Sequence, residues 1–146
     1  MDSKFLGKKY GPFHYEVGVE KVREFAMALA GGVPSSAFPA ESPLVGHYTE
    51  YPAVAPPTFA AVYNIQPFAA AIFDPELDIN MMMLVHGEQG FTFVRPVKPG
   101  DSLNTEGEIT QFAEKAGKKF LSVKSTTRDA KGDVVTVGDW MAVIRG

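Results

Sequence analysis

The chain has 146 residues, of which 45% are hydrophobic and 21% are charged, and its formal net charge is -3. This balance is typical of a globular domain with a sizeable core, and the net negative charge excludes the basic surface that nucleic-acid-binding proteins use. Cysteine is absent, which excludes disulfides, thiolate metal sites and cysteine nucleophiles. The first ten residues are charged and lack the apolar run of a secretory signal, and no stretch reaches the ~20 apolar residues of a membrane span. We therefore expect one domain, residues 1–146, in the cytoplasm and without a nucleic-acid or membrane partner.

The first predicted element is a short helix over residues 18–31. Val22, Phe25, Ala26 and Leu29 recur at helical spacing, and the glycine pair at 31 and 32 ends the pattern. A long proline-rich stretch without periodicity follows, from 33 to 56. Loops of this length in a compact domain are usually functional or act as lids.

A second helix, about residues 57–73, is predicted from "PPTFAAVYNIQPFAAAIFD". It is apolar on nearly all sides, which is typical of a buried helix. Pro57 suits its first turn, whereas Pro67 predicts a kink or break. The pair Asp74-Pro75 ends it.

Four strands are predicted after this helix, at about 82–95, 102–113, 119–128 and 134–144. The stretches "KPGD", "EKAGK" and "DAKGD" supply the turns between them. In the second strand Leu103, Thr105, Gly107 and Ile109 share one face, which indicates a sheet with one buried and one wet face. The order predicts an α+β fold, in which an antiparallel sheet buries one face against the apolar helix.

The first of these strands contains a histidine. In a regular strand His86 and Glu88 share a face, while Val85, Phe91 and Phe93 take the other and pack on the helix. Alternatively, the nearby glycines introduce a bulge that turns His86 in another direction.

Three stretches occur in an order that resembles a known family. They are "YEVGVEKVREFAMAL", "AVAPPTFAAVY" and "LVHGEQGFTFVRPVKPGDSL". Together they resemble the N-terminal domain of MaoC-like dehydratases, and they are similar to the small subunits of mycobacterial-type (3R)-hydroxyacyl-ACP dehydratases. The resemblance runs from about Tyr15 to the end of the chain. It implies the hot-dog fold, an antiparallel sheet wrapped around a central apolar helix.

The resemblance also implies a chemistry. Active members are hydro-lyases of fatty-acid metabolism that add water to an enoyl thioester, or remove it from an (R)-3-hydroxyacyl thioester, on coenzyme A or acyl carrier protein. The reaction needs an acid, a base and N–H groups that polarise the thioester carbonyl. The resemblance implies no metal or redox cofactor. In the family an Asp and a His act from a loop of the form G-D-x-N-P-x-H that follows the first helix.

That loop does not match here. The corresponding stretch is "AGGVPSSAF", with Gly32 where the family has its Asp. Two alternatives remain open. In one, the chain is an (R)-specific enoyl-thioester hydratase or 3-hydroxyacyl-thioester dehydratase, or a subunit of one, in which His86 or His47 contributes chemistry. In the other, it is a non-catalytic acyl-binding subunit whose partner chain supplies the Asp/His dyad. A hot-dog thioesterase is a third, weaker alternative, since no acid stands out on the central helix before Asp74.

The candidate catalytic residues are His86 and His47. His86 either acts near the thioester or is a hydrogen-bonded residue at a subunit seam, and His47 either replaces the missing dyad or is a surface residue. From the resemblance, the acyl thioester is expected to lie between the central helix and the sheet. The predicted substrate-binding residues are Gly31, Gly32, Pro57, Thr58, Phe59, Tyr63, Gly87 and Glu88. Because one such sheet leaves an edge and an apolar face uncovered, a homodimer, or a heterodimer with a catalytic hot-dog subunit, is expected.

Overall fold

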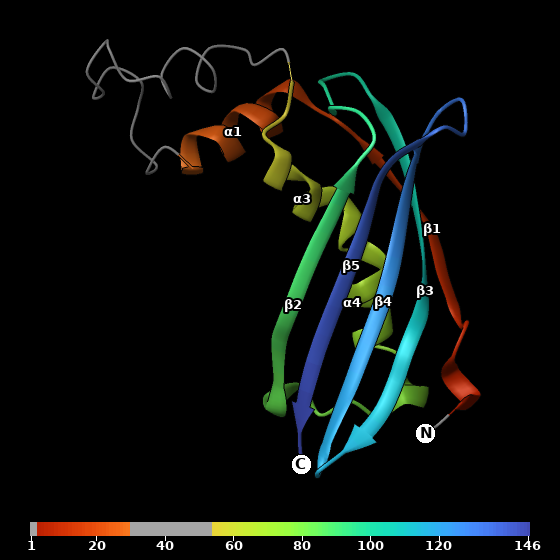
Figure 1. The fold of residues 1–146 in the computed structure, drawn as a ribbon. Helices are drawn as coiled ribbons and strands as arrows, with labels where there is room; N and C mark the ends of the chain where they lie inside the picture. The colour runs from red at the N-terminus through yellow and green to blue at the C-terminus, as the bar shows by residue number, and fades with distance from the viewer. Residues whose placement is uncertain (1–2, 30–53) are drawn as a thin grey trace.

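The protein is described by a computed structural model for residues 3–29 and 54–146. A five-stranded antiparallel sheet, in the order β1-β3-β4-β5-β2, covers a central helical segment (Figure 1). The strands are β1 (Lys9–Glu16), β2 (Leu84–Phe93), β3 (Ser102–Lys115), β4 (Lys118–Asp129) and β5 (Val134–Arg145). The helices are α1 (Val19–Leu29), α3 (Ala60–Asn64) and α4 (Gln66–Ile72), with short 3-10 turns at Ser3–Phe5, Pro57–Phe59, Pro75–Leu77 and Met81–Met83. The predicted α+β architecture is confirmed.

The central helix is divided into two parts, as its proline predicted. A 3-10 turn leads into α3, α3 ends at Asn64, and α4 starts at Gln66. Pro67 lies in the first turn of α4, where its missing N–H costs no intrahelical bond. After α4, Asp74 accepts a hydrogen bond from the backbone N–H of Glu76 and starts the next turn. Within the described residues, no helix combines the length and hydropathy needed to cross a membrane.

The three predicted turns between strands are confirmed. Ala116 and Gly117 have φ of 52° and 69°, the paired positive values of a tight hairpin between β3 and β4. Gly100 has φ of 91° and follows Pro99, which is the arrangement of a type II turn. Strands β3, β4 and β5 form a continuous antiparallel meander, with a register shift at Ile109/Gln111 on β3 and at Thr127/Arg128 on β4.

The sequence prediction missed one strand, β1, at the edge of the sheet. It pairs with β3 from Lys9 to Glu16, with a register shift between Tyr10 and Phe13. Gly11 and Pro12 lie at that irregularity and interrupt the alternation by which strands are recognised, and proline is tolerated in sheets only at edges and bulges. His14 lies within β1.

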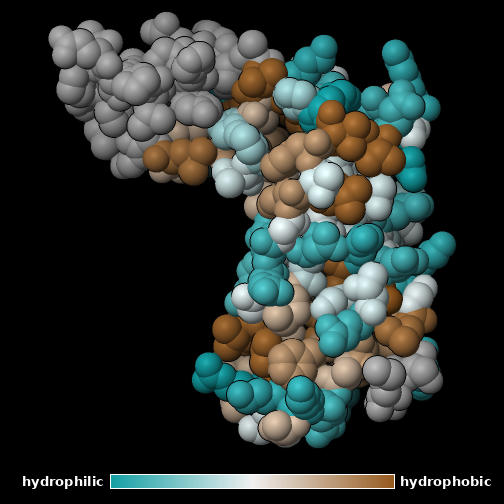
Figure 2. Space-filling view, viewed as in Figure 1, coloured by the Kyte–Doolittle hydropathy of each residue, from teal (hydrophilic) through white to brown (hydrophobic). Residues whose placement is uncertain are grey.

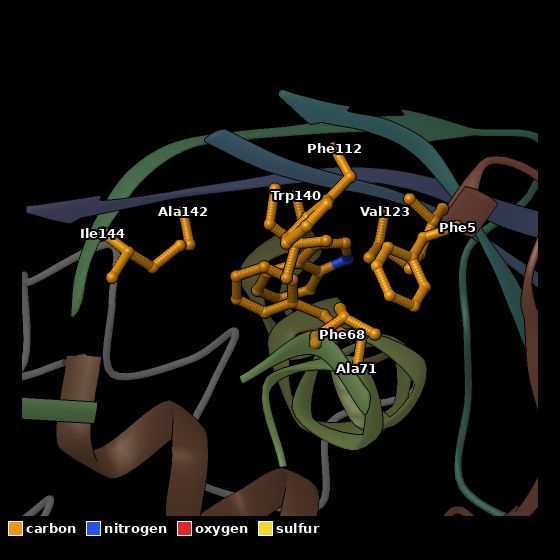
Figure 3. Packing of buried hydrophobic residues seen from close by; sticks show 11 residues of the cluster. Phe5, Phe68, Ala71, Phe112, Val123, Trp140, Ala142 and Ile144 are labelled. Carbon is orange, nitrogen blue, oxygen red and sulfur yellow. The ribbon is translucent and has the colours of Figure 1, made fainter. Parts of the chain in front are cut away.

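The core consists of two apolar clusters. The first lies around α4, the second half of β3, the first half of β4 and the second half of β5. In it Phe68 and Trp140 stack with ring centroids 5.5 Å apart (Figure 3). The second lies around α1, α3 and the beginning of β3. It contains Val17, Val22, Ala55, Phe59, Ala60, Tyr63, Val97, Leu103 and Val135.

A polar layer lies between the two clusters, which are bridged on the side of β2 by Phe91. It consists of buried residues on α3 and on the inner faces of β3, β4 and β5, namely Asn64, Thr105, Ser125, Thr127 and Thr136. Asn64 Nδ2 donates to Thr127 Oγ1 at 2.9 Å, and Thr127 in turn shares a hydrogen bond of 2.8 Å with Thr105. Buried polar groups need such partners, so the layer fixes the position of α3 on the sheet.

Candidate functional site

A cavity of about 300 Å³ opens where the central helix begins and β2 ends. The chain enters the helix through Ala55 and Pro56, and the N–H of Ala55 donates a 2.7 Å hydrogen bond to the carbonyl of Val97, just beyond β2. Pro56 is extended and Pro57 occupies the first turn, so the helix starts abruptly. This bond holds the helix start beside the chain that leaves β2, with the cavity between them.

We call this the apolar cavity. Its walls are formed by the segment that leads into the helix, by α3 and by the end of β2 with the following turn. The lining residues are Val54, Ala55, Pro56, Pro57, Phe59, Ala60, Tyr63, Phe93, Val94, Arg95, Pro96 and Val97. All but Tyr63 and Arg95 have wholly hydrocarbon side chains, and the mouth is marked by Phe93 and Val94, which are exposed. In Figure 2 hydrophobic side chains gather at the upper end of the molecule, where β2 ends and α3 begins in Figure 1.

Aromatic rings make the inner wall of the apolar cavity rigid. Phe59 is fully buried and meets Phe25 of α1 edge-to-face, with centroids 5.4 Å apart. It also contacts Tyr63, one turn further along the helix, at 6.1 Å. Such edge-to-face and tilted contacts favour one fixed arrangement of the rings.

Tyr63 forms the deep end of the cavity. Its hydroxyl shares a hydrogen bond of 2.8 Å with Thr136, and its carbonyl accepts one of 3.2 Å from Thr105 Oγ1. Burial raises the pKa of the Tyr63 hydroxyl, although its bond to Thr136 opposes this. The hydroxyl therefore stays protonated, and its partner lies in the polar layer.

Arg95 holds the outer wall. Its guanidinium donates to Asp101 at 2.8 Å and to Asp129 at 3.1 Å, joining the end of β2 to the next turn and to the β4–β5 hairpin. The bond to Asp101 and, after it, the bond to Asp129 raise the pKa of Arg95, and the guanidinium holds the pKa of Asp129 below its usual value. A second, polar groove of about 610 Å³ begins at this wall and shares Val54, Arg95 and Pro96 with the apolar cavity. We call it the mouth groove; it also exposes Lys98 and Lys131.

Three of the predicted substrate-binding residues line the apolar cavity together: Pro57, Phe59 and Tyr63. Thr58 lies in the same turn but does not line it. The sequence analysis missed the opposite wall, from Phe93 to Val97. The alternation of "FTFVRPV" marked this stretch as the end of a strand, but only the fold brings it against the helix start.

The regular-strand prediction for His86 and Glu88 is wrong, and the bulge alternative is confirmed. The register of β2 on β5 shifts between His86 and Glu88, so that the intervening residue, Gly87, has no partner. A side chain at Gly87 would meet the side chain of Met141 at 3.0 Å, and glycine avoids this contact. One inserted residue reverses the facing of everything before it. His86 therefore faces the helix, and Val85 faces outward.

The imidazole of His86 belongs to an aromatic group. It stacks on Trp140, with centroids 5.8 Å apart and an interplanar angle of 20°, and it also contacts Phe68 of α4 at 5.7 Å. Its Nε2 lies 3.2 Å from the carbonyl oxygen of Glu88. Phe93, at the cavity mouth, lies seven residues further along β2, which in a strand corresponds to roughly 20 Å. His86 and the apolar cavity are thus separate features.

The other predicted site residues do not converge on the cavity. Gly87 is the bulge residue, and Glu88 faces outward beside Met141 and lines a shallow groove there. Gly31, Gly32 and His47 lie outside the described residues.

The described lining of the apolar cavity offers binding rather than acid–base chemistry. It contains no carboxylate and no imidazole, its tyrosine hydroxyl stays protonated, and its guanidinium is held by two carboxylates. These walls can enclose an apolar chain and exclude water.

Comparison with known proteins places this hot-dog domain in the dehydratase class. The model of the FAS1-like dehydratase domain region matches residues 4–137. A UPF0336 protein of Saccharopolyspora erythraea is 35% identical over 148 aligned residues, which cover all of this chain and 92% of that protein. The chain belongs to this family of FAS1-like dehydratase domains.

Solved structures share the fold. A chain of the C-terminally truncated HadBC (3R-hydroxyacyl-ACP dehydratase) complex from Mycobacterium tuberculosis superposes with a TM-score of 0.71 at 24% identity, over 98% of this chain and 99% of that one. A MaoC-like dehydratase superposes with a TM-score of 0.69 at 27% identity, over 97% of this chain but 42% of that one. The expected resemblance and the hot-dog fold are thereby confirmed.

Proposed function

We propose that this chain is the acyl-binding subunit of an (R)-specific enoyl-thioester hydratase or 3-hydroxyacyl-thioester dehydratase, and that a second hot-dog chain supplies the Asp/His dyad. The observation that carries the proposal is the apolar cavity, which has hydrocarbon walls and no acid–base group among its described lining residues. Of the two alternatives left open by the sequence, this one fits that lining.

The cavity suits an acyl tail. Burying a methylene against such walls gains about 0.8 kcal/mol, so a tail of several carbons supplies most of the binding energy. Binding energy far from the reacting carbons can then hold the thioester in place for a base and an acid on the partner. The mouth groove, which begins at Arg95, gives the polar arm of coenzyme A or acyl carrier protein a route to the surface.

Strand β2 is the surface that we assign to the partner. It ends the strand order, so one side of its backbone has no neighbour in the described sheet. Protected edge strands are usually short or carry charged side chains, whereas β2 is ten residues long and carries exposed Val85 and Phe93. Such an edge favours pairing with another strand. The structural relative from M. tuberculosis is itself a complex, which supports a two-chain assembly.

No metal or redox cofactor enters this proposal, since water addition to an enoyl thioester needs only an acid, a base and N–H donors. Full activity after dialysis against EDTA is the expected result for the assembled enzyme.

A binding measurement tests the role of the cavity. Isothermal titration of the purified chain with octanoyl-CoA should give saturable binding, and Ala60→Phe, which fills the cavity from α3, should abolish it. Ala113→Phe adds the same group on β3, away from the cavity lining, and should bind like the wild type. Equal binding by Ala60→Phe and the wild type would contradict the assignment of the cavity.

A further inference from the structure

The polar layer bears on which acyl chains the apolar cavity can take. The cavity ends at Tyr63, whose hydroxyl and carbonyl are both bonded to threonines of that layer. Beyond it lies the first apolar cluster, around Phe68 and Trp140. An acyl chain that grew past Tyr63 along the helix would have to cross the polar layer, or displace Phe91, which packs against both clusters, to reach further hydrocarbon.

We propose that Tyr63, held by Thr136, is the specificity-determining residue of this subunit and limits it to medium-length acyl chains. The inference rests on the proposed function, because it assumes that the apolar cavity holds the acyl tail. It adds the class of substrate and the group that sets the limit.

The first reason is the cost of passing the layer. Displacing the Tyr63 side chain would leave the buried hydroxyl of Thr136 without its 2.8 Å hydrogen-bond partner, and moving the backbone would also break the 3.2 Å bond from Thr105 to the Tyr63 carbonyl. Buried polar groups that lose their partners are strongly unfavourable, and a methylene placed between them gains little in return. The neighbouring Asn64 is equally fixed, since it donates to Thr127 and accepts from Trp140. The end of the cavity is therefore rigid.

The second reason is size. A methylene needs about the room of a water molecule in the liquid, roughly 30 Å³. The cavity of about 300 Å³ thus holds at most about ten such groups, and fewer at the packing density of proteins. Octanoyl and decanoyl chains fit this space, whereas part of a palmitoyl chain would remain in water.

The third reason is the neighbourhood of Tyr63. Phe59 is fully buried, and Phe25 and Tyr15 pack around it at 5.4 and 6.3 Å, so aromatic rings close this wall within the part of the chain that the structure describes. Tyr63 itself is 2% exposed, with its ring 6.5 Å from that of Tyr15. Shortening Tyr63 is thus the simplest way to deepen the cavity.

The test is a chain-length profile of binding by the purified chain, with butyryl-, octanoyl-, dodecanoyl- and palmitoyl-CoA as ligands. For the wild type, the binding free energy per acyl carbon should be largest for octanoyl-CoA, and palmitoyl-CoA should bind no more tightly than octanoyl-CoA. Tyr63→Ala should tighten palmitoyl-CoA by about tenfold relative to octanoyl-CoA, as expected for a few newly buried methylenes. Ala60→Leu, which shortens the cavity, should shift the profile toward butyryl-CoA.

Controls separate this inference from the proposed function. Phe112→Leu removes volume from the other apolar cluster and should keep the wild-type profile. If Tyr63→Ala does not fold, the opposite shift by Ala60→Leu and a relaxed length limit in Tyr63→Phe, which keeps the ring but loses the bond to Thr136, still decide the matter. A wild-type profile in both Tyr63→Ala and Ala60→Leu, with binding intact, would overturn the inference alone. A wild-type chain that binds no acyl-CoA of any length would overturn the proposed function and the inference with it.

Discussion

The indole Nε1 of Trp140 donates a 2.8 Å hydrogen bond to Oδ1 of Asn64, which joins the centre of β5 to the last residue of α3. The same amide donates from Nδ2 to Thr127 on β4. One buried side chain thus uses both ends of its amide to hold the helix on two strands. Because both partners are also buried, neither can turn to water if the amide is removed.

We predict that Asn64→Leu, which keeps the volume but removes the amide, destabilises the protein by about 1–3 kcal/mol, since the buried indole N–H loses its partner and Thr127 keeps only its bond to Thr105. Urea unfolding followed by the fluorescence of Trp140, the single tryptophan, measures this directly. Asn104→Leu is the matched control on the outer face of β3, and it should change the free energy of unfolding by less than about 0.5 kcal/mol. Equal effects of the two changes would show that the layer contributes little.

Gly138 provides a second test of how closely α3 approaches the sheet. A Cβ at this position would clash with the side-chain amide of Asn64 and lie 2.7 Å from the indole nitrogen of Trp140. Gly138→Ala should therefore destabilise the protein by about 1–3 kcal/mol. Gly90→Ala on the neighbouring β2 meets nothing within 4 Å and should be nearly neutral, as thermal unfolding of the pair would show. A harmless Gly138→Ala would mean that the helix can shift without cost.

The ion pair between Arg95 and Asp129 predicts a pH dependence. The hydrogen bond from Arg95 lowers the pKa of Asp129 below the ordinary 3.8. A carboxyl whose pKa is lower in the folded state stabilises the protein above its unfolded pKa, and that contribution is lost as the pH falls through the folded value. Asp129→Asn should thus be less stable than the wild type at neutral pH, and the two should converge below about pH 4. A difference that stays constant from neutral pH to strong acid would contradict this origin.

We predict that His86 stabilises the fold through its aromatic contacts and does not transfer a proton in catalysis. His86→Phe should preserve the stack on Trp140 and leave turnover by the assembled enzyme within about twofold of the wild type, which corresponds to less than 0.5 kcal/mol in the barrier. His86→Ala should lose about 0.5–1.5 kcal/mol of stability with the aromatic contacts. The measurements are steady-state kinetics and urea unfolding of both variants. Turnover abolished in His86→Phe but not explained by unfolding would make this histidine catalytic.

Local signals in the sequence were sufficient for much of the fold. The turn residues around Gly100, Gly117 and Gly132 marked the starts of β3, β4 and β5, and all three have the positive φ that makes glycine preferable there. Pro67 located the division of the central helix. β1 was missed because Gly11 and Pro12 interrupt its pattern at a place where an edge strand tolerates them.

The site was less accessible from the sequence because it depends on contacts between distant segments. The period-2 rule placed His86 on the outer face, and a single bulge residue, Gly87, reversed that result. In the polar layer Asn64 bonds to Ser125 and Thr127, which are 61 and 63 positions further along the chain. No local sequence pattern predicts such a network. Pro57, Phe59 and Tyr63 were found because the helix start was recognised as a whole.

Hydration of an enoyl-CoA, followed by the loss of the absorbance of its conjugated double bond, tests the central claim most directly. The chain should be assayed alone, and again with a hot-dog chain that carries the G-D-x-N-P-x-H loop. We predict no turnover by this chain alone, turnover of octenoyl-CoA by the pair, and loss of that turnover when Ala60→Phe fills the apolar cavity. Turnover of crotonyl-CoA or octenoyl-CoA by the purified chain alone would contradict the account.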